Sequence, residues 1–267
     1  MTRLLTIASG KGGTGKTWLA IALAQALAER GSQGRRVLLV DADWGLANVD
    51  VQLGLRSPVA FDPRRGLRAM TEAVERVDEG GFEVLPGASG SGRFADLSTE
   101  AVDRFQAALT TFAKARRYDD VVVDLAAGAD LPVRTLWSAG DTKLLVISPD
   151  PSALTDGYAL AKLCRTDGDR AAPTVVVNRA TSRPAGEVAG LKLTRALQGF
   201  LGVGAAPASV LLEEPRVLDA VRAQTPFLRR HPASPMATAI RDLAANLPAS
   251  DQKPSAAPSF RLSEAAT

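Results

Sequence analysis

Short apolar runs alternate with longer amphipathic segments along most of this chain. The runs are rich in valine, isoleucine and leucine, as in strands buried on both faces of a parallel sheet, and they cover residues 3–8, 37–41, 82–85, 120–124, 143–148 and 174–178. Helical patterns lie between most of these runs, at Thr17–Arg30, Gly66–Val77, Thr99–Arg116 and Ser152–Arg165. We therefore expect an α/β fold with right-handed crossovers, a mostly parallel sheet and helices on both faces.

The last part of the chain predicts a short strand at 209–212 and helices at 213–223 and 234–247, the second with Ser234 as its N-cap and Pro235 at its first position. We expect one nucleotide-binding domain over 1–248 and a disordered tail over 249–267, where serine, proline and alanine follow no period. Pro254 and Pro258 interrupt this tail. It therefore lacks the amphipathic pattern of a membrane-binding helix, and we expect no membrane contact through it.

Residues 10–17 read Gly-Lys-Gly-Gly-Thr-Gly-Lys-Thr, which matches the phosphate-binding pattern G-x-x-x-x-G-K-S/T. The pattern lies between a predicted strand and a predicted helix, where free backbone N–H groups and the helix dipole favour an anion. Lys16 can then reach the β- and γ-phosphates, and the Thr17 hydroxyl can ligate Mg²⁺. These residues predict binding of a nucleoside triphosphate with Mg²⁺.

Polar side chains also follow other predicted strands. Asp41 and Asp43 end the second strand, Asp124 ends the strand at 120–124, and Asn178 ends the strand at 174–178. In open α/β sheets, ligands bind outside the carboxyl ends of the strands. We therefore expect these side chains to converge with Lys16 on one site.

Lys11 is a second lysine in the loop, and it resembles the signature lysine of the deviant Walker A motif of the MinD/ParA ATPases. The segment Asp41–Leu55 reads D-A-D-W-G-L-A-N-V-D-V-Q-L-G-L. It resembles the D-A-D-L-G-L-A-N-V-D segment of the FlhG (FleN) branch, with Trp44 in place of the usual aliphatic residue. Ile147–Leu160 is similar to the T-P-E-P-T-A-I-T-D-A-Y-A-L stretch that MinD and FlhG share.

This resemblance implies a P-loop NTPase fold and a slow, Mg²⁺-dependent ATPase that is activated by dimerisation. In the family, Lys11 reaches the phosphates of a second copy, Asp43 orients the attacking water, and the Asn178-Arg179 pair contacts the adenine. Lys11, Lys16 and Asp43 are thus the expected catalytic residues, and Thr17, Asp41 and Asp124 the expected metal site. The expected contacts to ATP are Gly10, Lys11, Gly12, Gly13, Thr14, Gly15, Lys16, Thr17, Trp18, Asn178 and Arg179.

Two biological roles compete. The Asp41–Leu55 segment favours an FlhG-like homodimer that regulates flagellar number or placement through flagellar or polar assembly factors, with Asn48, Val49 and Asp50 presented to the partner. The alternative is a ParA-type ATPase that positions DNA or another cargo, with a DNA-binding patch made of Arg216, Arg222, Arg229, Arg230 and Arg241. A metabolic ligase of the same fold is a third reading, which Lys11 and the D-A-D segment disfavour.

Composition adds few constraints. The net charge of +3 over 267 residues is weak evidence for nucleic acid. Cys164 and His231 are each alone, so no disulfide forms within the chain and no His/Cys metal site can be built. We expect a cytoplasmic protein, with recruitment to a pole or an assembly site as an extension of the FlhG-like role. No apolar run is long enough to span a membrane.

Overall fold

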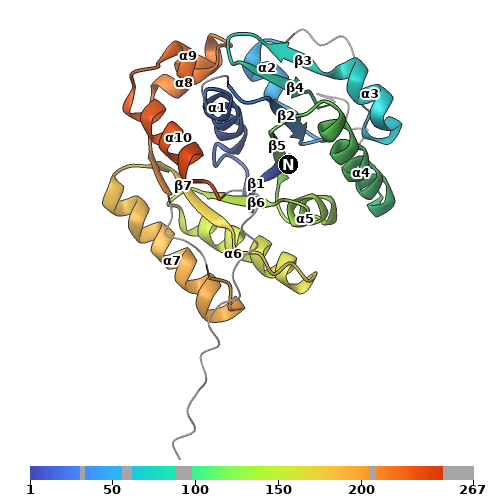
Figure 1. The fold of residues 1–267 in the computed structure, drawn as a ribbon. Coiled ribbons are helices and arrows are strands. Elements are labelled where there is room, and N and C mark those ends of the chain that lie inside the picture. Colours follow the sequence, from blue (N-terminus) through green and yellow to red (C-terminus); the bar gives the residue numbers. More distant parts are fainter. Residues whose placement is uncertain (31–33, 56–61, 88–97, 205–208, 249–267) are drawn as a thin grey trace, which may run out of the picture.

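The computed structural model describes residues 1–30, 34–55, 62–87, 98–204 and 209–248. Its centre is one eight-stranded sheet in the order β3-β4-β2-β5-β1-β6-β7-β8 (Figure 1). The strands are β1 Arg3–Ser9, β2 Val37–Ala42, β3 Glu75–Val77, β4 Phe82–Leu85, β5 Asp120–Ala127, β6 Thr142–Ile147, β7 Thr174–Ala180 and β8 Ser209–Leu212. All neighbours run parallel except β3 and β4.

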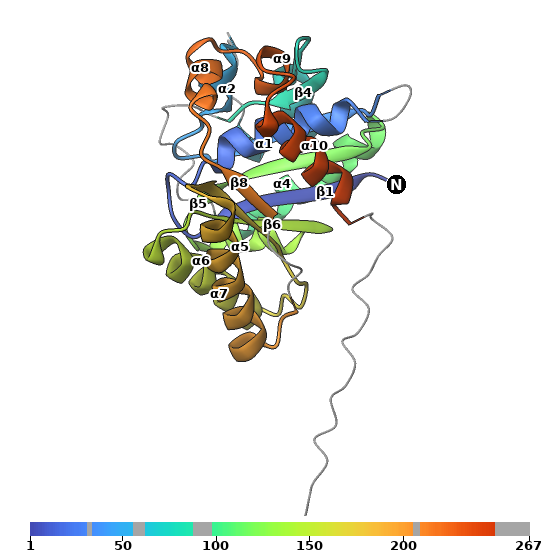
Figure 2. The ribbon, with the colours of Figure 1, turned by 90° about the vertical axis from the view of Figure 1, so that its left-hand side faces the viewer.

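Helices cover both faces of the sheet, as Figures 1 and 2 show. One face packs against α3 Gly66–Ala73, α4 Thr99–Ala115, α5 Leu131–Ser138, α6 Pro151–Thr166 and α7 Arg183–Leu201. The other packs against α1 Lys16–Ala28, α2 Val49–Leu53, α8 Arg216–Arg222, α9 Phe227–Arg230 and α10 Pro235–Asn246. A 3-10 turn at Pro63–Arg65 precedes α3. The expected three-layer α/β fold with a mostly parallel sheet is confirmed.

The central strands bring the predicted acids together. β5 pairs with both β1 and β2, and Asp41 of β2 lies directly opposite Asp124 of β5 in the register. The phosphate loop follows β1, the neighbour of β5 on its other side. Because these strands are parallel, their carboxyl ends meet at one edge of the sheet, which is the edge the sequence predicted.

Two helix predictions were wrong in their extent. The helix expected over 66–77 ends at Ala73, because Val74 is extended and Glu75–Val77 pairs antiparallel with β4. The helix expected over 213–223 begins only at Arg216, after Pro215. The ends of the other predicted helices and strands lie within two residues of the observed ones, except that β5 continues three residues beyond its predicted end.

The helix α7 was missed altogether, together with the shorter α2, α5 and α9. Glycines at 186, 190 and 199 and the proline at 184 hide the helical pattern of α7. Gly186 is required by packing, because a Cβ there would lie 2.3 Å from Cγ1 of Val210 in β8. Helix α7 begins at a good cap, where Ser182 Oγ accepts from the backbone N–H of Ala185.

The last described residue is tied to the first strand, since Arg3 Nη1 donates to the carbonyl oxygen of Pro248 at 2.8 Å. The predicted tail at 249–267 lies outside the described residues, so the domain boundary stays a prediction. Among the described helices, none combines the length and the apolarity that a membrane crossing needs.

Candidate nucleotide-binding site

The phosphate loop runs from Gly10 to Gly15, between the end of β1 and the first turn of α1. Two of its glycines adopt left-handed backbone, with φ of 78° at Gly13 and 82° at Gly15. Gly10 lies against α6, where a Cβ would be 2.1 Å from the carbonyl oxygen of Asp156. Gly15 caps α1 without a side-chain hydrogen bond, so the N–H groups of the first helical turn are available to an anion.

Residues at the end of β7 hold this loop from the side. Asn178 Nδ2 donates to the carbonyl oxygen of Thr14 at 2.8 Å, and Arg179 Nη1 donates to that of Gly13 at 3.2 Å. Arg179 itself has a positive φ of 58°, which is uncommon for a residue with a side chain. The structure thus gives both residues a loop contact that sequence reasoning missed, while their contact with adenine stays a prediction.

Trp18, which was also expected to contact the nucleotide, is buried. Its ring packs edge-on against Phe227 of α9, with 5.5 Å between the ring centroids. The indole therefore belongs to the core between α1 and α9, and only the backbone N–H of Trp18 is left for a phosphate oxygen.

Lys16 and Asp124 form a buried ion pair at the sheet edge. Lys16 Nζ lies 3.0 Å from Asp124 Oδ1, and the two side chains are 7% and 1% exposed. Burial raises the pKa of Asp124, and the charge of Lys16 opposes that rise. Asp124 Oδ2 is buried and makes no hydrogen bond of normal geometry with any described residue.

Asp41 holds the loop that follows β2. Its Oδ2 accepts from the backbone N–H groups of Asn48 and Val49, each at 3.0 Å, and its Oδ1 accepts from that of Asp43 at 3.1 Å. Burial and the nearby charge of Asp124 raise the pKa of Asp41 to about 7, against the opposing effect of these hydrogen bonds. Asp41 therefore fixes the start of α2.

Asp43 is only partly buried, and its Oδ1 accepts from the backbone N–H of Leu46 at 3.0 Å. The partner surface expected at Asn48, Val49 and Asp50 needs one correction, because Val49 is fully buried. The exposed apolar side chains here are Leu46 and Val51, at 73% and 58%. Val49 turns inward because its N–H bonds to Asp41 and its side chain packs in the core below α1.

Lys11 lies apart from Lys16. Its side chain is at the surface, where Nζ donates to Ser152 Oγ in the first turn of α6 at 2.6 Å. Ser152 was not among the predicted site residues. It stands within the Ile147–Leu160 stretch, which resembled the family and which could have pointed to it.

The side chains beside the phosphate loop are too few to hold a metal ion by themselves. They suit a Mg²⁺ ion whose other ligands are nucleotide phosphates and water. No group of three or more metal-binding side chains occurs in the part of the chain that the structure describes. Thr17 and the unpaired oxygen of Asp124 instead offer one hydroxyl and one acceptor beside the loop. Mg²⁺ usually keeps several waters and binds through few protein ligands plus phosphates, so these residues fit it.

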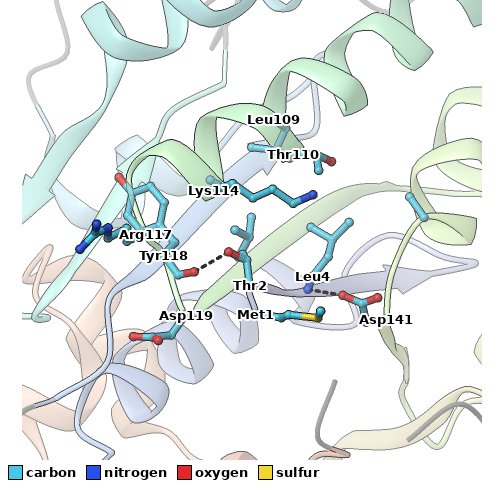
Figure 3. Close-up of a pocket in the computed structure, with 13 residues that line it drawn as sticks. Met1, Thr2, Leu4, Leu109, Thr110, Lys114, Arg117, Tyr118, Asp119 and Asp141 are labelled. Carbon is cyan, nitrogen blue, oxygen red and sulfur yellow. Dashed lines mark hydrogen bonds between the residues drawn. The ribbon is translucent and has the colours of Figure 1, made fainter. Parts of the chain in front are cut away.

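A separate cavity of about 700 Å³ lies at the opposite, amino edge of the sheet (Figure 3). Two polar contacts lie in its lining, where Thr2 Oγ1 donates to the carbonyl oxygen of Tyr118 at 2.7 Å and the Leu4 N–H donates to Asp141 at 2.8 Å. Because the phosphate loop follows the other end of β1, this cavity takes no part in the site.

The glycine loop between β1 and α1, the buried Lys16–Asp124 pair and the acids at the ends of β2 and β5 define a P-loop nucleotide-binding protein. Residues 5–190 match the family described as the CobQ/CobB/MinD/ParA nucleotide binding domain. The chain belongs to this family.

Several individual proteins of known name are similar to this chain. The chain is 34% identical over 248 residues to the antiactivator FleN of Pseudomonas aeruginosa, covering 91% of this chain and 85% of FleN. It is 34% identical over 167 residues to the flagellum site-determining protein YlxH of Helicobacter pylori, covering 61% of this chain and 53% of YlxH. The structure of MinD from Pyrococcus horikoshii, complexed with Mg-ADP, aligns with a TM-score of 0.68 and 25% identity, covering 91% of this chain and 95% of that one.

Proposed function

We propose that this protein is an ATP-driven dimerisation switch of the MinD and FlhG type that regulates flagellar number or placement through protein partners. The protein is a Mg²⁺-dependent ATPase of the MinD/ParA family. The observation that best supports a dimerisation switch is that the two lysines of the phosphate loop lie in different environments. Lys16 is buried on Asp124, whereas Lys11 lies at the surface against Ser152, where a second copy can meet it.

The residues divide the chemistry as follows. Lys16 and the loop N–H groups would neutralise the β- and γ-phosphates, and Thr17, Asp41 and Asp124 would hold Mg²⁺. Asp43 orients the attacking water. Phosphoryl transfer depends mainly on charge stabilisation, and a cation supplied by a second molecule contributes about 10³–10⁵ in rate in related NTPases. Lys11 of the second copy is that cation, so the monomer is a poor catalyst.

The partner surface lies beside the loop that follows β2. Leu46 and Val51 are exposed there, and the backbone between them is held by Asp41 through Asn48 and Val49. A change in the charge or metal contacts of Asp41 therefore acts directly on the start of α2. This gives a physical route by which the bound nucleotide can alter the surface offered to a flagellar or polar assembly factor.

DNA positioning is the second candidate function. The arginines expected to bind DNA are mostly engaged in ion pairs within the chain, which weakens this candidate. Arg216 pairs with Glu214, Arg230 with Asp219 and Arg241 with Glu29. Of the five arginines, only Arg222 and Arg229 make no ion pair with residues that the structure describes. Two unpaired cations support only weak DNA binding at physiological salt, because few phosphates would be neutralised.

A deletion strain separates the two functions. Loss of the gene should change the number or placement of flagella and leave chromosome and plasmid inheritance intact, and a fluorescent fusion should show a cytoplasmic protein recruited to a pole or assembly site. Normal flagellation in the deletion strain, together with tight ATP-dependent DNA binding by the purified protein, would favour the ParA-type function.

A further inference from the structure

Trp44 follows Asp43 directly, yet it is a core residue. It is 4% exposed, and its ring packs edge-on against Phe105 of α4, with 5.1 Å between centroids and an interplanar angle of 87°. The indole Nε1 is buried and has no hydrogen-bond partner among the described residues. Native structures rarely leave a buried N–H unpaired, so this donor requires an explanation.

The same side chain borders a small cavity of about 170 Å³ between the two loops that flank the site. One wall is Ala42–Gly45, from the last residue of β2 onward, and the other comes from Leu125 and Ala126 of β5 and from α5. Asp130 also lines this cavity. It stands at the N-cap of α5, where its carboxylate makes no capping hydrogen bond. A residue with an unpaired donor and a residue whose carboxylate makes no capping hydrogen bond thus line one cavity.

We propose that Trp44 is a positioning residue for Asp43 that couples the two loops. When the γ-phosphate draws the loops together, the cavity closes and the Trp44 N–H donates to the Asp130 carboxylate. The inference rests on the proposed function, because it assigns Trp44 a task in the hydrolysis that Asp43 serves. Packing on Phe105 holds the Trp44 ring in place. A movement of the loop before α5 would therefore act through Trp44 on the neighbouring Asp43.

The informative variant is Trp44→Phe, which keeps an aromatic ring against Phe105 and removes the indole N–H together with part of the ring volume. Trp44→Leu would also remove the aromatic packing. Because the smaller ring leaves space in the core, the urea midpoint of Trp44→Phe should fall somewhat. Its kcat should also fall about tenfold, the loss expected for one hydrogen bond to a charged group, with KM unchanged. Asp130→Ala should lower kcat by the same factor, and Asp130→Asn, which keeps an acceptor oxygen, should recover most of the rate.

The double variant Trp44→Phe/Asp130→Ala should be no slower than either single variant, since both remove one interaction. A non-hydrolysable ATP analogue should also change the Trp44 fluorescence, taken as wild type minus Trp44→Phe, and this change should be lost in Asp130→Ala. Additive effects on kcat, or a fluorescence change that survives Asp130→Ala, would overturn the pairing.

The controls keep the two proposals apart. If wild-type protein hydrolyses ATP and Asp43→Ala does not, but Trp44→Phe has wild-type kcat, the inference on Trp44 fails alone. If the wild-type protein shows no Mg²⁺-dependent hydrolysis in any oligomeric state, the proposed function fails and the inference fails with it.

Discussion

At the residue scale, the site depends on charges in opposite environments. The Lys16 ammonium is buried beside Asp124, and the Lys11 ammonium is held at the surface by a single hydroxyl. A buried ammonium with one carboxylate partner can accept further negatively charged partners, such as phosphate oxygens. The surface lysine can leave Ser152 at little cost, because an exposed hydrogen bond competes with water.

Replacing Lys16 by alanine should abolish most ATP binding. The change leaves phosphate charge uncompensated and also leaves Asp124 buried without its partner. Charge-assisted contacts contribute roughly 1.5–3 kcal/mol each, so the affinity should fall at least about tenfold in calorimetry. Lys114→Ala, on the exposed side of α4 far along the chain from the loop, is the matched control and should bind as wild type. Wild-type affinity in Lys16→Ala would show that the assignment is wrong.

Asp41 predicts a pH dependence of stability. Its pKa is raised from 3.8 to about 7 in the folded chain, so the folded state keeps a proton that the unfolded state releases. This group therefore stabilises the nucleotide-free fold most at low pH, and its contribution is lost as the pH rises through about 7. Urea unfolding between pH ~5 and ~8 should show a slope of up to about 1.4 kcal/mol per pH unit from this carboxyl.

Asp41→Asn should flatten that slope, although Asp124, whose pKa is also raised, contributes in the same direction. A slope that is unchanged in Asp41→Asn would contradict the assignment of the raised pKa to Asp41. Bound Mg·ATP should reverse the trend in the wild type, because the cation favours the ionised carboxylates.

At the scale of elements, the phosphate loop is held by parts that are distant in sequence. Gly10 contacts the backbone of α6, and Asn178 and Arg179 hold the loop carbonyls from the end of β7. The position of the loop therefore depends on how α6 and β7 pack. A glycine is needed at position 10 for close approach, whereas position 12 faces open space.

This difference predicts unequal effects of two alanine substitutions. Gly10→Ala places a Cβ 2.1 Å from a backbone oxygen and should lower the free energy of unfolding by about 1–3 kcal/mol and weaken ATP binding. Gly12→Ala meets nothing within 4 Å and should fold with wild-type stability. Equal urea midpoints for the two variants would contradict the loop geometry.

The elements also show what the sequence could and could not predict. The buried strands and the glycine loop have strong local patterns, and the ends of the predicted strands lie within three residues of the observed ones. Helix α7 was missed because its glycines serve tertiary contacts, as Gly186 does against Val210. The loop contacts of Asn178 and the Ser152 partner of Lys11 join residues more than 140 positions apart, so no local pattern could reveal them.

At the scale of the whole molecule, one edge of the sheet gathers the phosphate loop, the three acids and the exposed Lys11, while α2 rests on Asp41. A nucleotide at this edge therefore touches both the chemistry and the surface that a second copy or a partner would meet. This is the arrangement expected of a switch whose ATP turnover controls assembly rather than metabolism.

Light scattering of the purified protein with ATP and Mg²⁺ tests this account most directly. Wild-type protein should shift from monomer to dimer on ATP binding and return as ATP is hydrolysed. Asp43→Ala should remain a long-lived dimer, and Lys11→Ala should bind ATP yet remain monomeric with little hydrolysis. A Lys11→Ala protein that dimerises and hydrolyses ATP as the wild type does would contradict the central claim.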